Sequence, residues 1–189
     1  TLVTFRTTSR IPLRSTNSAM PYNKKAVLAA NTQAIRIVLR LEKEQRLATE
    51  EERIILAAYQ GFGGLKCVLN RTEQPEDIRY WAKSEQELFK PICALKQLIY
   101  REAPDALVAK RYWESIKASV LTSFYTDTRI VSAIATALAT TGVEFRSCLD
   151  PSSGIGAFAD TFAPYARRID ALEKDLLTAR IAQALHPLG

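Results

Sequence analysis

The sequence predicts a mixed α/β fold that is mostly helical and ends in a short β-α-β-α unit. Helical periodicity and helix-capping patterns recur between residues 26 and 141. Two short apolar runs, residues 145–149 and 168–172, then alternate with helical segments, and a glycine-containing loop joins the first run to its helix. This alternation is typical of domains built on a parallel sheet.

Composition divides the chain into three regions. Residues 1–25 are rich in Ser, Thr and Asn, carry five basic residues and no acidic one, and are predicted to form a basic arm or linker. Residues 26–120 are predicted to form a helical domain. Residues 121–189 are predicted to begin an incomplete second domain, because two strands alone make a poor sheet. The chain also lacks an initiator Met, so we expect a fragment of a longer protein.

The first helices are predicted from their periodicity and their caps. A helix is expected from about residue 26 to residue 47. Thr49 and Glu52 form a capping-box pattern that predicts a second helix over residues 50–60. Residues 61–64, Gly-Phe-Gly-Gly, end it, although a helix stop requires only one glycine.

Three further helices are predicted before the glycine loop. Ser84 and Glu87 form a second capping-box pattern, which predicts a helix to about residue 102 with Pro91 as a kink or restart. Asp105 begins the next helix, in which Trp113 is expected to be a core residue. Thr126-Asp127 caps a helix that Gly142 closes.

The remaining elements form the β-α-β-α unit. They are a strand at 145–149, a helix that ends near Pro164, a strand at 168–172 and a helix at 175–186. The two strands are expected to pair in parallel through a right-handed crossover.

The glycine loop is the main candidate for a ligand site. It reads Asp150-Pro151-Ser152-Ser153-Gly154-Ile155-Gly156-Ala157-Phe158. Glycine allows backbone N–H groups to approach a ligand closely. Glu173 follows at the end of the second apolar run, at the spacing where an acidic side chain can accept hydrogen bonds from a ribose. Together these residues predict half of a nucleoside-cofactor site.

Charge favours one cofactor class. Asp150 at the strand end would repel the pyrophosphate of a dinucleotide but would attract an ammonium group. S-adenosylmethionine carries an ammonium, a carboxylate and a ribose. We expect Asp150 to face the ammonium, the amides from Gly154 to Gly156 to face the carboxylate, and Glu173 to bind the ribose. A P-loop Lys-Ser/Thr pair does not follow the glycines.

Three segments resemble N6-adenine DNA methyltransferases. Asp150-Pro151-x-x-Gly154-x-Gly156-x-Phe158 is similar to their cofactor motif. Phe124-Tyr125-Thr126 resembles the Phe-Tyr-Thr-Pro segment that precedes this motif and packs on the methionine end of the cofactor, although Asp127 stands in place of the Pro. Residues 171–175 resemble the acidic segment that binds the ribose. The resemblance implies the first β-α-β-α unit of a Rossmann-like, S-adenosylmethionine-dependent methyltransferase domain with a truncated sheet.

The same resemblance implies a set of cofactor-binding residues. They are Tyr125, Thr126, Asp150, Pro151, Ser152, Gly154, Gly156, Phe158 and Glu173.

A further segment narrows the resemblance. Residues 56–65 are similar to the Tyr-x-Gly-Trp-Gly-Gly segment of very large methylase–helicase proteins of conjugative elements and phages, with Phe62 in place of the Trp. The resemblance covers about residues 45–189. It implies a parent protein that methylates DNA for a mobile element or a restriction–modification system.

The catalytic motif of that family, Asp/Asn-Pro-Pro-aromatic, does not occur in the sequence. The chain has eight prolines and no two are adjacent. No residue is therefore assigned a catalytic role, because nothing in the chain would position the adenine amino group for attack on the methyl group. We expect the chain to be inactive by itself, as the cofactor-binding half-site of a larger enzyme.

Basic residues concentrate near the N-terminus. Residues 1–47 hold nine Lys/Arg against two acidic residues, whereas the rest of the chain holds seventeen against eighteen. Arg36, Arg40 and Lys43 lie at i, i+4 and i+7 and line one helix stripe. We expect them to contact DNA phosphates without sequence preference and in a salt-dependent manner. The alternative is a solvated helix face, since no aromatic stacking pattern accompanies these charges.

Composition excludes several other classes. No apolar run approaches the roughly 20 residues of a membrane span, and no secretory leader pattern is present. Three widely spaced cysteines give no zinc spacing and fit reduced thiols, so we expect a cytoplasmic protein without a metal. The single histidine, His186, is interpreted as a helix C-terminal cap or surface residue, which excludes triad hydrolases.

Three alternative functions stay open at this point. The chain could be a helical DNA- or protein-binding module with a vestigial Rossmann-like appendage. It could be part of a nicotinamide or flavin enzyme, against which Asp150 and the Phe-Tyr-Thr segment argue. It could also belong to a methyltransferase that acts on RNA or protein, which only the family resemblance disfavours.

Overall fold

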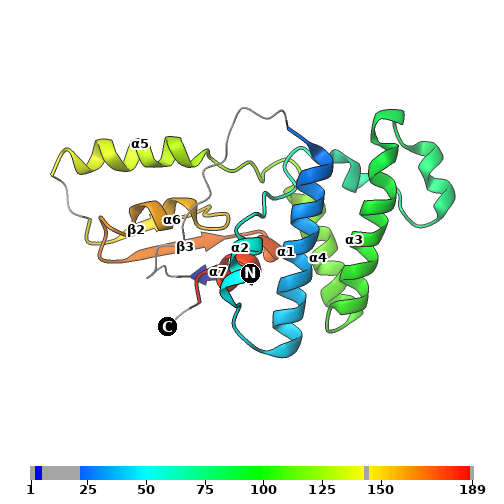
Figure 1. Ribbon diagram of the computed structural model, residues 1–189, viewed down its shortest axis with the longest axis horizontal. Helices are drawn as coiled ribbons and strands as arrows, with labels where there is room; N and C mark the ends of the chain where they lie inside the picture. The colour runs from blue at the N-terminus through cyan, green and yellow to red at the C-terminus, as the bar shows by residue number, and fades with distance from the viewer. Residues whose placement is uncertain (1–2, 6–21, 143–144, 188–189) are drawn as a thin grey trace.

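The computed structural model describes residues 3–5, 22–142 and 145–187. Within them, packed helices lie beside a small sheet (Figure 1), so the fold is mixed α/β and mostly helical as predicted. The helices are α1 (Lys24–Glu44), α2 (Glu50–Leu56), α3 (Phe89–Glu102), α4 (Ala106–Ser119), α5 (Thr128–Ala139), α6 (Ala157–Phe162) and α7 (Leu176–Leu185). The 3-10 turns are η1 (Lys66–Leu69), η2 (Pro75–Tyr80) and η3 (Lys83–Leu88), and the strands are β1 (Val3–Phe5), β2 (Cys148–Asp150) and β3 (Ile169–Glu173).

Helix α1 is central to the helical body and packs against α2, α3 and α7. Asn23 caps it, because its side-chain oxygen accepts hydrogen bonds from the N–H groups of Lys25 and Ala26. The helix ends earlier than predicted, since Gln45 adopts a left-handed conformation with φ of 49°.

Helix α2 begins at its predicted capping box and is shorter than predicted. The Thr49 side chain accepts from the Glu52 N–H, and the Glu52 carboxylate accepts from the Thr49 N–H. The helix ends at Leu56 because buried Asn31 of α1 captures the chain beyond it. The Asn31 amide accepts from the Gln60 N–H (2.9 Å) and donates to the Gly61 carbonyl (2.5 Å). These hydrogen bonds replace those of a continuing helix.

The second predicted capping box is wrong. Ser84 and Glu87 lie within η3, which has no side-chain cap. Helix α3 begins instead at Phe89 and places Pro91 in its first turn, where the missing N–H costs no intrahelical hydrogen bond. Helices α4 and α5 begin at their predicted caps, with Asp105 accepting from Val108 and Asp127 accepting from Arg129.

The two predicted strands pair in parallel as expected. Leu149 of β2 is opposite Asp170 of β3, and Asp150 is opposite Ala171. Each strand lies slightly later in the chain than predicted, and only an isolated bridge joins Phe145 to Ala166. Helix α6 lies against β3 on one face of this sheet, and α5 packs on the other side of α6 (Figure 1).

A third strand comes from the predicted arm. Residues 3–5 form β1, which pairs antiparallel with β3 so that the strand order is β1-β3-β2. The rest of the arm that precedes residue 22 lies outside the described residues. Three residues carry no periodicity that could predict a strand, and β1 exists only because β3 offers it a partner edge.

Helix α7 joins the β-α-β-α unit to the helical body. It contacts β1 and β3 as well as α1, α2 and α4. Leu177, Ile181 and Leu185 belong to the same apolar core as the residues of α1 and α3. Arg180 also pairs with Glu42 of α1 at 3.3 Å. Helix α7 therefore belongs to the main core, whereas Ile169 and Ala171 of the sheet pack with Ala159 and Ala182 in a second, smaller cluster.

The turn between α1 and α2 is organised by Glu52, which is 7% exposed. Its carboxylate accepts hydrogen bonds from Arg46 (2.7 and 2.8 Å) and from Arg40 (2.7 Å). Chiefly because of Arg46, with the Thr49 N–H next in importance, the pKa of Glu52 is lowered to about 2.

We predict that Glu52→Gln lowers the free energy of unfolding at pH 7 by about 1.5–3 kcal/mol, the range for hydrogen bonds to a charged group. The folded pKa lies below the ordinary value of 4.5, so this stabilisation is present above pH 4.5 and is lost as pH falls towards about 2. Urea unfolding at several pH values measures both effects. The exposed control Glu50→Gln should change stability by less than about 0.5 kcal/mol, and an equal loss in both variants would contradict the prediction.

Candidate functional site

The glycine loop lies at the carboxyl end of β2, on the side of the sheet that points towards the helical body (Figure 1). Asp150 is the first residue of this loop. One oxygen, Oδ1, accepts a hydrogen bond from the Ser152 N–H (3.2 Å), whereas Oδ2 is buried and has no hydrogen-bond partner among the described residues. Burial raises the pKa of Asp150, and the Ser152 N–H offsets this in part. A buried carboxylate oxygen without a partner is costly, and a ligand that carries a donor or a cation would relieve the cost.

Glu173 ends the neighbouring strand β3 and binds the loop directly. Its Oε2 accepts from the Gly154 N–H (2.8 Å), and its Oε1 accepts from the Asp175 N–H (2.7 Å). Burial raises the pKa of Glu173. The two hydrogen bonds lower the pKa, but by less than burial raises it. Each carboxylate oxygen has a second lone pair, so Glu173 keeps the capacity to accept from a further donor.

The loop amides expected to face a ligand carboxylate are engaged within the protein. The Gly154 N–H is bound to Glu173, and the Gly156 N–H donates to the Ser153 carbonyl at 2.9 Å. Ser153 in turn binds the Leu172 carbonyl through its N–H (2.9 Å) and its hydroxyl (3.1 Å). The loop is therefore folded back onto β3, and an anionic ligand group would have to displace Glu173 from Gly154.

Tyr125 packs between two glycines that are far apart in sequence. A Cβ on Gly154 would lie 2.9 Å from the Tyr125 ring, and a Cβ on Gly61 would lie 3.2 Å from its hydroxyl oxygen. Both glycines also have positive φ, 57° and 72°, which side chains rarely adopt. Tyr125 is 37% exposed overall, yet burial of its hydroxyl raises its pKa, which Thr178 of α7 lowers in part.

The glycine cluster at residues 61–64 also packs against the segment that leads to Tyr125. A Cβ on Gly63 would lie 2.0 Å from the backbone oxygen of Ser123. The Gly64 N–H donates to the Val120 carbonyl (3.1 Å), and the Tyr22 hydroxyl donates to the Gly63 carbonyl (3.0 Å). Close backbone packing thus explains Gly63, whereas Gly61 and Gly64 have positive φ, 72° and 78°, so a helix stop alone does not account for the cluster.

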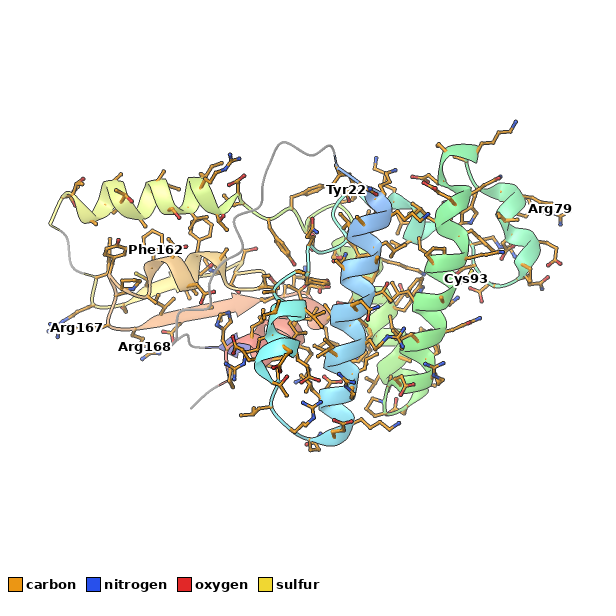
Figure 2. The ribbon with its side chains drawn as sticks, in the orientation of Figure 1. Tyr22, Arg79, Cys93, Phe162, Arg167 and Arg168 are labelled. Carbon is orange, nitrogen blue, oxygen red and sulfur yellow. The ribbon has the colours of Figure 1, made fainter. Side chains whose placement is uncertain are left out.

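An apolar cleft of about 360 Å³ opens beside the loop, between β2 and α6. Phe158 and Phe162 stack in it with centroids 6.3 Å apart, and Phe162 lies beneath α5 (Figure 2). The lining residues are Cys148, Leu149, Asp150, Pro151, Phe158, Ala159, Phe162 and Ile169.

The remaining predicted cofactor residues lie on the surface around the loop. Pro151, Ser152 and Thr126 are exposed, and Phe124, which was not assigned to the site, is 67% exposed. The structure thus brings Tyr125, Gly154 and Glu173 together.

The predicted DNA-contacting stripe is largely charge-compensated. Arg40 pairs with Glu52 at 2.7 Å, and Lys43 pairs with Glu102 at 3.5 Å. Arg36 is exposed on the same helix. The contact with DNA stays a prediction. The stripe carries less uncompensated positive charge than the count of basic residues in the sequence implies.

Sequence reasoning missed residues that hold the segments around Tyr125. Asn31 of α1 binds Gln60 and Gly61, and the hydroxyl of Tyr59, which follows α2, is 3.3 Å from that of Thr178 on α7. His186 is the C-cap residue of α7, as one interpretation had it, but it is buried and not on the surface. No local pattern could have identified these residues, because they meet only through helix packing.

Comparison of the chain with protein-family models, with curated proteins and with solved structures finds no match. None of the helices in the described ranges has the length and apolar character needed to cross a bilayer. The residues with described positions also contain no group of three His, Cys, Asp or Glu side chains arranged to hold a metal ion.

We predict that Asp150→Asn stabilises the free protein at neutral pH, raising Tm by about 2–4 °C. The variant keeps Oδ1 for the Ser152 N–H and removes a buried negative charge. Because burial raises the folded pKa, the penalty of the ionised form acts above that pKa and vanishes below the unfolded value. The Tm values of the variant and the wild-type chain should therefore converge as pH falls to about 4. A variant Tm below that of the wild-type chain at pH 7 would contradict the prediction.

We also predict that Gly63→Ala destabilises the fold by more than about 3 kcal/mol, because the new Cβ cannot avoid the Ser123 carbonyl. Gly142→Ala is the matched control. No atom of the described residues lies within 4 Å of a Cβ there, so its positive φ of 71° is what opposes the change, at about 1 kcal/mol. Chemical denaturation measures both, and equal losses would show that close packing at Gly63 is unimportant.

Proposed function

We propose that the loop of residues 150–158, with Glu173 and Tyr125, forms the S-adenosylmethionine half-site of a Rossmann-like DNA adenine-N6 methyltransferase. The observation that carries the proposal is the buried Oδ2 of Asp150, which lies at the carboxyl end of a parallel strand and has no hydrogen-bond partner in the described part of the chain. Ligand sites of parallel α/β sheets occur at that end of the strands.

The charges around the loop support a ligand that is cationic near β2 and carries hydroxyls near β3. Asp150 offers an acceptor to an ammonium group. Glu173 offers its remaining lone pairs to ribose hydroxyls. A dinucleotide would bring a pyrophosphate towards two carboxylates, which is unfavourable. This argument selects a methyl-donor cofactor over a nicotinamide or flavin.

The specificity for adenine in DNA rests on the family resemblance. The order of the Gly-rich segment at 61–64, the Phe-Tyr-Thr segment and the Asp-Pro-Gly loop is the basis for it. In the structure these segments also adjoin one another, because Tyr125 contacts both Gly61 and Gly154. That contact supports a common role for the three segments.

The chain would bind the cofactor without transferring its methyl group. The catalytic Asp/Asn-Pro-Pro-aromatic motif is absent from its 189 residues. Methyl transfer would require that motif from another segment, placed where it can orient the adenine amino group.

A second candidate function is a helical binding module whose sheet unit is vestigial. The observation that favours it is that both oxygens of Glu173 and the amides of Gly154 and Gly156 already have partners within the protein. A loop satisfied in this way has less need of a ligand.

We predict that S-adenosylmethionine and S-adenosylhomocysteine bind the chain and that Asp150→Ala weakens the binding of S-adenosylmethionine by about 10–100-fold, as for loss of a hydrogen bond to a charged group. Asp170→Ala is the matched control, since Asp170 lies on the adjacent strand and pairs with Arg168. Calorimetric titration measures the affinities, with NAD as the competing ligand class.

Each outcome of this titration separates the candidates. Binding that only the Asp150 variant loses supports the methyltransferase half-site. Preference for NAD would support the nicotinamide alternative. Absence of binding by the wild-type chain would overturn the proposal and favour the binding module.

A further inference from the structure

His186, the single histidine of the chain, lies on the interior side of the glycine loop. His186 is the C-cap residue of α7 and is 3% exposed. Its ring atom Nε2 is 3.0 Å from the carbonyl oxygen of Ile155, the residue between Gly154 and Gly156. The ring therefore contacts the loop on the side that faces the protein interior.

The chemistry of this contact determines the state of the ring. A carbonyl oxygen can only accept, so Nε2 must carry a proton and donate it. Burial lowers the pKa of His186, which leaves a neutral ring near pH 7. Nδ1, which is 3.5 Å from Oδ1 of Asp160 on α6, is then the unprotonated nitrogen.

We infer that His186 is a positioning residue that holds the glycine loop in its observed conformation. Its hydrogen bond ties the Ile155 peptide to α7, and α7 packs against α1, α2 and α4. The loop is then held from two sides, by His186 at Ile155 and by Tyr125 at Gly154. The inference rests on the proposed function only in that this loop is the proposed cofactor loop.

The two glycines of the loop are the reason why a further hydrogen bond matters for its conformation. Gly154 and Gly156 both have positive φ, and glycine has more accessible backbone conformations than any other residue. A hydrogen bond to the carbonyl between them selects one of those conformations. Without it, the Gly154 and Gly156 peptides could rotate and lose their alignment with Glu173 and Ser153.

A pair of amide variants tests the inference. His186→Gln places its amide nitrogen near the position of Nε2 and can donate to Ile155, whereas His186→Asn is one bond too short. We expect hydrogen–deuterium exchange in residues 151–158 of the free protein to be about tenfold faster for the Asn variant than for the Gln variant. Exchange in α1 and α3 should be equal in both, and equal exchange in the loop would overturn the inference.

A second measurement needs no variant. Because the chain has one histidine, the ¹⁵N signals of its ring can be assigned without ambiguity. We expect the neutral tautomer with the proton on Nε2 at pH 7. A proton on Nδ1 alone, which would leave Nε2 without a proton to donate to Ile155, would overturn the inference even if the Asn variant failed to fold.

Cofactor affinity then separates this inference from the proposed function. If S-adenosylmethionine binds, its affinity should fall about tenfold in the Asn variant and recover in the Gln variant. If the wild-type chain does not bind it, the proposed function fails while the exchange and tautomer results still decide the role of His186.

Discussion

The candidate site depends on the packing of Tyr125 against Gly61 and Gly154. One ring fills the space that two missing side chains leave, and it thereby joins the α2–η1 connection to the loop after β2. Asn31 holds the first of these segments from α1, and Glu173 holds the second from β3. A side chain at either glycine would crowd the Tyr125 ring, so the loop conformation depends on packing against the helical body.

At the same loop lie carboxylates whose ionised form is disfavoured by burial. Burial raises the pKa values of Asp150 and Glu173, and one oxygen of Asp150 has no partner among the described residues. Glu52 shows the opposite arrangement, since arginines and a backbone N–H satisfy its carboxylate. The Glu52 carboxylate is thus compensated, whereas Asp150 keeps one buried oxygen to which a ligand could donate. Such local cost is expected at functional sites.

The positions of the candidate site residues at the strand ends could be predicted from the sequence, but their contacts could not. The Asp-Pro-Gly loop and Glu173 stand at strand ends that local patterns predict, and their proximity follows from parallel pairing. The pattern could not show that Glu173 would bind the Gly154 N–H, or that the Gly156 amide would bind Ser153. These contacts depend on how tightly the loop folds back onto β3. The role of His186 was likewise hidden, because a buried and an exposed C-cap have the same local sequence.

The sequence by itself determined the features that arise from neighbouring residues. These include the caps at Thr49, Asp105 and Asp127, the strand order along the chain and the parallel pairing of β2 with β3. Only the tertiary structure decided where α2 stops, that residues 3–5 form a strand, and that α7 belongs to the main core. The physical reason is the distance along the chain over which each interaction acts. Caps and periodicity act within a few residues, whereas these features require partners that lie far away along the chain.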